Sequence, residues 1–449
     1  MQFTKFFGYA LSLFFALNGI SSQAAASTKS SHHESEPNDL KLTDALSRPS
    51  LGPTNDSISC DGSKVYVTYN VTGTEGGIMA ELFDNVNGKL ITRETLTLDP
   101  NYPIVLGGFA SPDFKRFSIL DGVPTGPNSF DGRIRILDKN FNTLVERVIS
   151  STVGNFDFFT VTGGRFSDDG KYLSLAAGDG VAPNSSTDLY IFDSSTLDTV
   201  AFKTISHLNV GGPNFLTLEH HGKKRYYTTF GSCNGYFSPN FELTIQPPYF
   251  IEIYKIDFDN ETLDFVDGSP LPKFALVSST MSLGKKGLVS HGGFCSLFPN
   301  QLSIYDTNFL KTTSLPDDNA ESRILEFDGK TLEVKFKQAV NCCNETVLYP
   351  PHKGRTALVA QNTVVTDPTD PNVQRLDPEF YVLATLGKKN GKKQWEPLNL
   401  PRQDVVGAIS EFSHNGKWLV RTGNYGYFEG NPNVDSRGIH NVLLFKVLH

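Results

Sequence analysis

A four-residue polar turn recurs seven times along the chain, and this repeat limits the possible fold more than any other feature. The fourth residues of the copies fall at positions 62, 114, 170, 222, 284, 354 and 416, which are 52 to 70 residues apart. The copies read Ser-Cys-Asp-Gly, Ser-Pro-Asp-Phe, Ser-Asp-Asp-Gly, Glu-His-His-Gly, Met-Ser-Leu-Gly, Pro-His-Lys-Gly and Ser-His-Asn-Gly. A repeat of this length indicates an array of similar units that bury a shared core.

Apolar, β-branched and aromatic residues flank these turns, as at 65–67 and 418–420. A polar turn between two such runs is a hairpin signal. A second hairpin follows in several units, at 133–148, 188–200, 250–266 and 324–336. Two hairpins make one four-stranded sheet, which must stack on neighbours to bury both faces. The sequence therefore predicts an all-β fold, a seven-bladed β-propeller of four-stranded antiparallel blades over residues 39–449.

The two ends of the repeat region complement each other. The last unit stops just after the strand expected at 441–447 and lacks a fourth strand, whereas the segment 39–51 precedes the first unit and has no unit of its own. We therefore expect this N-terminal segment to supply the missing strand and to close the ring, which removes an unpaired sheet edge.

The turn regions also carry a family resemblance. The segments FSDDGKYL (166–173), FSHNGKWL (412–419) and ASPDFKRF (110–117) resemble the strand–turn–strand motif of TolB-type and lactonase-like (YVTN-type) seven-bladed propellers. The segment LYIFDSSTLDTV (189–200) is similar to their following hairpin. The resemblance implies the fold. It does not imply one function, since these families include hydrolases, lactonases, dehydrogenase subunits and binding modules.

The N-terminus has the three parts of a secretory signal. Lys5 supplies a positive charge, an apolar run covers 6–17, and three alanines at 24–26 form a cleavage site. We expect residues 1–26 to be a signal peptide, 27–38 a flexible segment, and the mature protein to be exported to the periplasm or the exterior. No later run is long and apolar enough for a membrane span. The net charge of −8, without a basic block, argues against a nucleic-acid partner.

The connections between the second and third strands of each unit are long, and in an antiparallel sheet they all emerge on one face. Loops on a rigid support often carry function, and the central channel opens onto this face. We expect it to bind a peptide, glycan or protein partner; the same residue types also serve turn geometry. The candidate ligand-binding residues are Asp121, Asp179, Tyr236, Phe294, Tyr425, Tyr427, Asp435 and His440.

A hydrolase of the lactonase-like kind, acting at the channel mouth, is the alternative function. His291, Arg375, Glu379 and Arg437 are residue types that can activate water and stabilise an oxyanion, although no spacing motif connects them. The sequence alone leaves open whether the protein is an enzyme.

Neither a metal nor another cofactor is expected. Four histidines, at 220, 221, 352 and 414, fall in the repeated turns, on the face opposite the long connections and in different units, so they cannot converge on one ion. Cys233 and Cys295 lie in long connections of adjacent units and form the predicted disulfide.

Overall fold

The structure is a computed structural model of the 449-residue chain. It describes residues 39–49, 51–71, 77–126, 129–151, 159–179, 186–206, 208–209, 213–237, 242–271, 275–293, 301–303, 322–340, 345–353, 356–366, 374–385, 395–397, 405–425 and 439–448. Apart from the short 3-10 helix η1 (Pro350–His352), the regular elements of these residues are strands. None of the described helices is long and apolar enough to cross a bilayer.

Among the described residues, five sheets have four strands each. In four of them the strands pair in the order in which they follow along the chain. The first contains β2 (Leu51–Ile58), β3 (Lys64–Val71), β4 (Ile78–Val86) and β5 (Lys89–Thr97), and the second contains β6 (Ile104–Gly107), β7 (Phe117–Gly126), β8 (Ser129–Leu137) and β9 (Thr143–Ser151). The third contains β19 (Ala275–Leu283), β20 (Lys286–Gly293), β22 (Ser322–Asp328) and β23 (Glu333–Val340), and the fourth contains β24 (Glu345–Leu348), β25 (Thr356–Thr366), β26 (Gln374–Thr385) and β27 (Trp395–Pro397). The predicted four-stranded antiparallel unit is therefore confirmed.

The sixth sheet has ten strands. It contains the meander β10 (Phe159–Phe166), β11 (Tyr172–Asp179), β12 (Ser186–Asp193) and β13 (Thr199–Ile205), and the meander β15 (Asn214–His220), β16 (Lys223–Phe237), β17 (Glu242–Asp257) and β18 (Thr262–Leu271), with β14 (Leu208–Asn209) and β21 (Gln301–Ser303) added. The two meanders are joined by a single parallel pairing, between Phe202 and Thr262.

The remaining sheet joins the two ends of the described chain. Its order is β1 (Asp39–Pro49), β30 (Ile439–Leu448), β29 (Trp418–Tyr425) and β28 (Val405–Phe412). β1 pairs antiparallel with β30 from Asp39 opposite Leu448 to Pro49 opposite Ile439. The N-terminal segment therefore forms the fourth strand of this sheet, beside β30.

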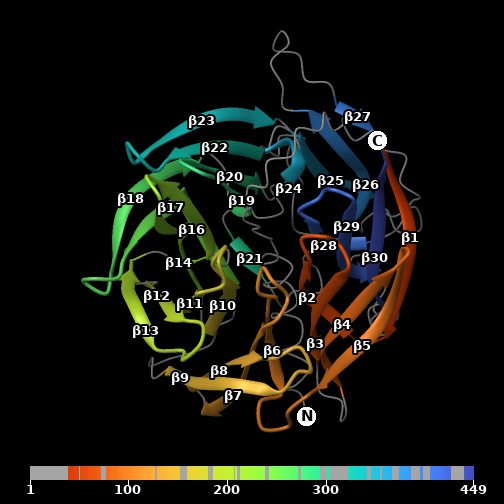
Figure 1. The fold of residues 1–449 in the computed structure, drawn as a ribbon, viewed down its shortest axis with the longest axis horizontal. Coiled ribbons are helices and arrows are strands. Elements are labelled where there is room, and N and C mark those ends of the chain that lie inside the picture. The colour runs from red at the N-terminus through yellow and green to blue at the C-terminus, as the bar shows by residue number, and fades with distance from the viewer. Residues whose placement is uncertain are drawn as a thin grey trace.

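The sheets surround a common centre in an all-β, propeller-like arrangement (Figure 1). The first strands of the units touch one another in cyclic order: β2 with β6, β6 with β10, β10 with β15, β15 with β19, β19 with β24, β24 with β28, and β28 with β2. These first strands are therefore the innermost strands, and side chains at their ends can meet across the axis.

The repeated turn is held by its own side chains. In the first copy the Ser59 hydroxyl donates to Asp61 (2.7 Å) and accepts from the amide of Lys64 (2.9 Å), while the amide of Gly62 donates to the Ser59 carbonyl (2.8 Å). The copies that begin at 111, 167 and 413 repeat these bonds. Gly62 has φ +74°, a backbone conformation that favours glycine.

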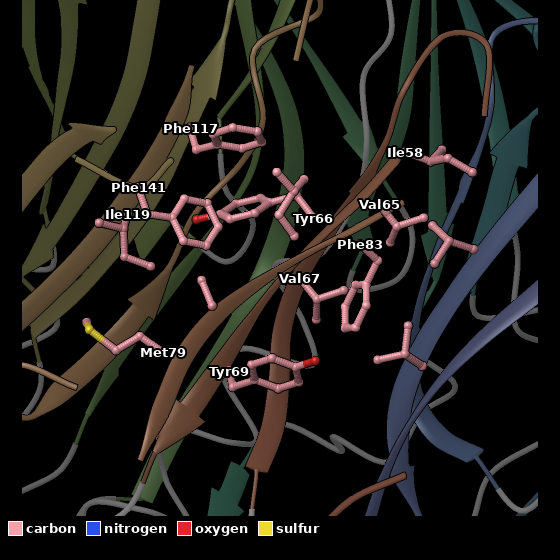
Figure 2. Close-up of a cluster of buried hydrophobic side chains, with 14 of the residues drawn as sticks. Ile58, Val65, Tyr66, Val67, Tyr69, Met79, Phe83, Phe117, Ile119 and Phe141 are labelled. Atoms are coloured by element: carbon pink, nitrogen blue, oxygen red, sulfur yellow. The ribbon is translucent and has the colours of Figure 1, made fainter. Parts of the chain in front are cut away.

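Packing between neighbouring sheets forms the core. Tyr66 of β3 packs its ring against Phe117 of β7 at 4.8 Å between centroids, and against Phe141, in the turn before β9, at 6.0 Å (Figure 2). The Tyr66 hydroxyl donates to the carbonyl of Ser118 at 2.9 Å. Burial of aromatic rings between neighbouring sheets stabilises both sheets, because a single sheet cannot bury its two faces on its own.

Several connections predicted as loops are strands over part of their length. β7 and β8 stay paired up to Gly126 opposite Ser129, within one of the long connections expected between second and third strands. β25 and β26 pair out to Thr366 opposite Gln374. Continuing the ladder pairs backbone groups that an irregular loop would leave to solvent, and the β-branched run at 363–366 suits strands.

Candidate functional site

Three charged residues lie near the turn ends of innermost strands. They are Asp56 of β2, Arg165 of β10 and Glu411 of β28, with 1%, 4% and 4% of their surfaces exposed. Arg165 and Glu411 occupy equivalent positions, each two residues before the serine that starts the repeated turn. We call these three residues the axial charge cluster, since they come from three different sheets around the common centre.

The guanidinium of Arg165 is the centre of this cluster. Its Cζ lies 4.1 Å from the centroid of the Phe109 ring, and its Nη2 is buried without a hydrogen-bond partner. Burial lowers the pKa of Arg165 to about 9, while the negative charges of Glu411 and Asp56 oppose this shift. A buried donor without an acceptor is costly. Arg165 can therefore bind an acceptor oxygen of a ligand.

The carboxylate of Asp56 is held by its surroundings. It accepts a hydrogen bond from the Thr422 hydroxyl at 3.0 Å, and Arg421 precedes Thr422 on β29 as a second buried cation. Two acids and the Arg165 guanidinium within electrostatic range of one another give a site with both signs of charge. Such a site suits a ligand that both donates and accepts hydrogen bonds, for example through hydroxyl or amide groups.

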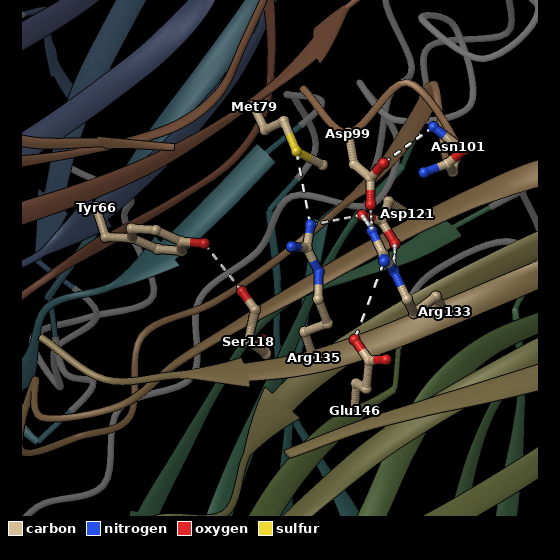
Figure 3. A network of polar contacts seen from close by, with 9 residues as sticks. All are labelled: Tyr66, Met79, Asp99, Asn101, Ser118, Asp121, Arg133, Arg135 and Glu146. Carbon is tan, nitrogen blue, oxygen red and sulfur yellow. Dashed lines mark hydrogen bonds and ion pairs between the residues drawn. The ribbon is translucent and has the colours of Figure 1, made fainter. Parts of the chain in front are cut away.

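Asp121, predicted to bind a ligand from a loop, instead lies within β7 and has no exposed surface. It accepts from Arg133 (2.9 and 2.8 Å) and from Arg135 (2.6 Å), and Arg133 also donates to Asp99 (2.7 Å; Figure 3). Arg133 stacks on the Tyr102 ring at 3.8 Å. The Asp121 carboxylate is therefore enclosed, and its hydrogen bonds with two arginines of β8 link β7 to β8.

Four other predicted binding residues lie in strands, at the ends away from the repeated turns. Asp179 ends β11, opposite Ser186, and Tyr236 lies opposite Thr244 near the end of β16. Tyr425 ends β29, opposite Ile439, and its neighbour Asn424 lies opposite His440. The structure thus brings Tyr425 and His440 onto adjacent strands. Phe294, Tyr427 and Asp435 lie outside the described residues.

The candidate catalytic residues are distributed over two sheets. His291 lies in β20, opposite Val277 and Arg323. Arg375 and Glu379 both lie in β26. Arg437 lies outside the described residues, as does Cys295, the predicted disulfide partner of Cys233 in β16.

One hairpin extends well beyond its unit. β15 pairs only with Lys223–Thr229 of β16, and β16 continues for eight more residues to Phe237. Beyond Cys233 opposite Tyr249, β16 and β17 stay paired as far as Phe237 opposite Leu243. β21 adds a third strand there, with Leu302 opposite Leu243. We call residues 234–237 of β16 and 242–246 of β17 the extended hairpin, and they lie at the strand ends away from the repeated turns.

Among the described residues, no group of three or more His, Cys, Asp or Glu side chains is placed to hold a metal ion. His220 and His414 lie in the repeated turns, as predicted.

Sequence reasoning missed the axial charge cluster, although a signal was present. The segments Arg-Phe-Ser at 165–167 and Glu-Phe-Ser at 411–413 place a charge at the same repeat position, in strands that are otherwise apolar or small. A charge at such a position on an innermost strand points toward the axis of a propeller. The comparison of repeat copies by charge, rather than by turn residues, would have found it.

Comparisons with known proteins give likeness at the level of the fold. No family model and no curated protein matches the chain. An oligogalacturonate lyase in complex with manganese is 12% identical, covers 94% of this chain and 96% of its own, with a TM-score of 0.44. A 6-phosphogluconolactonase-like protein from Bacteroides uniformis is 10% identical, with 82% of this chain and 93% of that chain covered and a TM-score of 0.42. BamB from Moraxella catarrhalis is 12% identical, with 87% of this chain and 81% of that chain covered and a TM-score of 0.35. The chain resembles lactonase-like propellers in fold alone.

Proposed function

We propose that this protein is an exported seven-bladed β-propeller that binds a peptide, glycan or protein partner on the face opposite the repeated turns. In this proposal residues 1–26 are a signal peptide, 27–38 a flexible segment and 39–449 the propeller. The binding residues are those at the strand ends and connections of that face: Asp179, Tyr236, Phe294, Tyr425, Tyr427, Asp435 and His440, with Cys233 and Cys295 as a disulfide.

Two features support seven blades in a closed ring. The ten-stranded sheet consists of two four-stranded meanders that meet at one parallel pairing, so it counts as two blades. The seven first strands touch in cyclic order, and β1 completes the last sheet next to the first one. Arg48 of β1 donates to Glu81 of β4 at 2.7 and 3.0 Å, which ties that junction across two sheets.

The extended hairpin is the observation that carries the binding role. Its four residues on β16, Asn234 to Phe237, correspond to a reach of about 13 Å, at roughly 3.3 Å per residue. After a register shift between Cys233 and Asn234, these residues stay paired with β17, and β21 widens the projection by one strand. A preformed projection on one face supports recognition of a partner, because little ordering entropy is lost when it binds.

A thermal-shift screen tests the proposal. The wild type is heated with panels of peptides, oligosaccharides and lactones. The same panels are tested on a variant in which residues 234–248 are replaced by Asn-Gly, a turn suited to a tight hairpin. A ligand at 100 times its Kd adds about 2.7 kcal/mol to stability. We expect a peptide or glycan to raise the Tm of the wild type and not of the variant.

Three results would contradict the proposal. Equal Tm shifts for the two proteins would place the site away from the extended hairpin. Absence of a shift with every peptide and oligosaccharide would argue against this ligand class. Turnover of a lactone by the wild type, abolished in His291→Ala, would establish the hydrolase alternative. N-terminal sequencing of the exported protein tests the signal peptide, with Ser27 as the expected first residue.

A further inference from the structure

Three short turns on the face of the repeated turns, opposite the extended hairpin, are held together by hydrogen bonds. They are the β15–β16 turn at 220–222, the β19–β20 turn at 284–285 and the β22–β23 turn at 329–332. The amide of Glu219 donates to the Gly284 carbonyl (2.6 Å), and the amide of Gly329 donates to the Lys285 carbonyl (3.1 Å). Arg225 donates to the Gly329 carbonyl (3.0 Å). These bonds fix the relative positions of turns from two neighbouring units.

Positive groups gather on the locked turns. Burial lowers the pKa of His220, and interactions with His221, Lys285, Arg225 and Lys330 lower it further. All four therefore lie within electrostatic range of one imidazole. The surface formed by Lys223, Arg225, Lys285 and Lys330 around this imidazole is called the cationic turn patch below.

The acidic residues around the patch leave it with an excess of positive charge. Asp169 pairs with Lys224 (3.1 Å) and Glu326 with Lys286 (2.5 Å), and Glu333 pairs with Lys335 (3.3 Å). The pKa of Asp328 is lowered, mainly because the backbone amide of Lys330 donates a hydrogen bond to its carboxylate. Glu219 is an exposed acid beside the β15–β16 turn. Lys223, Lys285 and Lys330 are exposed and form no ion pair with a described residue.

The surroundings of the patch favour a flexible polyanion over a folded acidic protein. Stable protein interfaces need an apolar core, whereas Leu332 is the one large apolar residue of these turns that is more than a third exposed. A Cβ atom added at Gly222 or Gly284 would meet nothing within 4 Å, so the turn tips are open. Lysines act as point charges that tolerate variable anion geometry.

We propose that the cationic turn patch binds an acidic polysaccharide, one that carries carboxylate or sulfate groups along its chain. The rigid turns place several positive charges along one short path, so successive anionic groups of the same chain can be neutralised together. Attraction of this kind concentrates such a chain on one face of a protein whose net charge is −8. The site is independent of the extended hairpin, which leaves from the other ends of β16 and β17.

Binding of alginate and of dextran sulfate to the full mature chain tests this inference, with neutral dextran as the uncharged probe. The variant Lys285→Gln/Lys330→Gln is compared with Lys115→Gln/Lys139→Gln, which removes the same charge from two turns of the β6–β9 sheet. We expect the first variant to raise the Kd at least tenfold and the control to change it less than twofold. Wild-type affinity should fall steeply between 50 and 300 mM NaCl, because salt screens exposed charges.

Three outcomes would overturn the inference. The first is an equal loss of polysaccharide affinity in the two double variants. The second is tighter binding of polyglutamate or of anionic phosphatidylglycerol vesicles than of either polysaccharide. The third is no binding of either polysaccharide at 50 mM NaCl. Circular dichroism melting checks that both variants fold. The variant that lacks the extended hairpin should still bind the polysaccharides, so failure of the proposed function and failure of this site give different results. NMR titration of His220 should show its pKa rising when alginate binds.

Discussion

Asp168 makes the stability of this protein depend on pH in a direction that is unusual for an aspartate. Its carboxylate accepts from the Ser282 hydroxyl (2.5 Å) and the Thr217 amide (3.1 Å), which belong to two other units. The residue as a whole keeps some exposure, but its carboxyl group is enclosed. This burial raises its pKa from 3.8 to about 6, although both hydrogen bonds act to lower it.

The sign of the effect follows from proton binding. Between pH 3.8 and 6 the folded protein holds the Asp168 proton more tightly than the unfolded chain does. The contribution of this group is therefore fully present below about pH 4 and is lost as the pH rises through 6. A shift of about two pKa units corresponds to a change of about 3 kcal/mol in the free energy of unfolding.

Urea denaturation of the wild type and of Asp168→Asn, at pH 4 and at pH 7.5, measures this contribution. The variant cannot titrate at this position. We expect the stability of the wild type relative to the variant to fall by about 2–3 kcal/mol between the two pH values. Other carboxylates titrate equally in both proteins and cancel in the difference.

The neighbouring Asp169 is the matched control. Burial acts to raise its pKa, but hydrogen bonds from Tyr226, Ser167 and Lys224 outweigh this and lower it. Its contribution is thus present above its unfolded pKa and is lost at lower pH, so Asp169→Asn should not reproduce the behaviour of Asp168→Asn. A difference between wild type and Asp168→Asn that does not change from pH 4 to pH 7.5 would refute the reasoning.

Three further substitutions test local packing and charge pairing. Gly416→Ala and Gly222→Ala both add a Cβ atom at positive φ (+68° and +73°), but at Gly416 it would clash with the Tyr349 hydroxyl, whereas at Gly222 it meets nothing within 4 Å. Gly416→Ala should therefore cost roughly 1–3 kcal/mol more in urea titrations, and equal costs would contradict the clash. Asp121→Ala should cost about 3–5 kcal/mol, since it leaves Arg133 and Arg135 buried without their shared carboxylate. A loss below about 1 kcal/mol would show that water replaces the carboxylate.

The strands and turns could be predicted because the bonds that form them are local. The turn at 59–64 closes on its own serine and aspartate, so a stretch of six residues suffices to recognise it. The pairing of β1 with β30 could be inferred from an excess strand at one end and a missing strand at the other. The extended hairpin was predicted as a loop because nothing in 231–249 marks where a ladder ends.

The recurring four-residue turn was determined by the sequence alone, and with it the antiparallel units and their strands. Tertiary structure decided what the charges on those units do. Asp168 and Asp169 are adjacent in one turn, yet their pKa values move in opposite directions. Burial dominates at the Asp168 carboxyl, whereas hydrogen bonds from Tyr226, Ser167 and Lys224 outweigh burial at Asp169. Arg165 is likewise buried near Phe109, Asp56 and Glu411, which are distant in sequence. Burial and Coulomb energy depend on these spatial neighbours, which only the packed sheets specify.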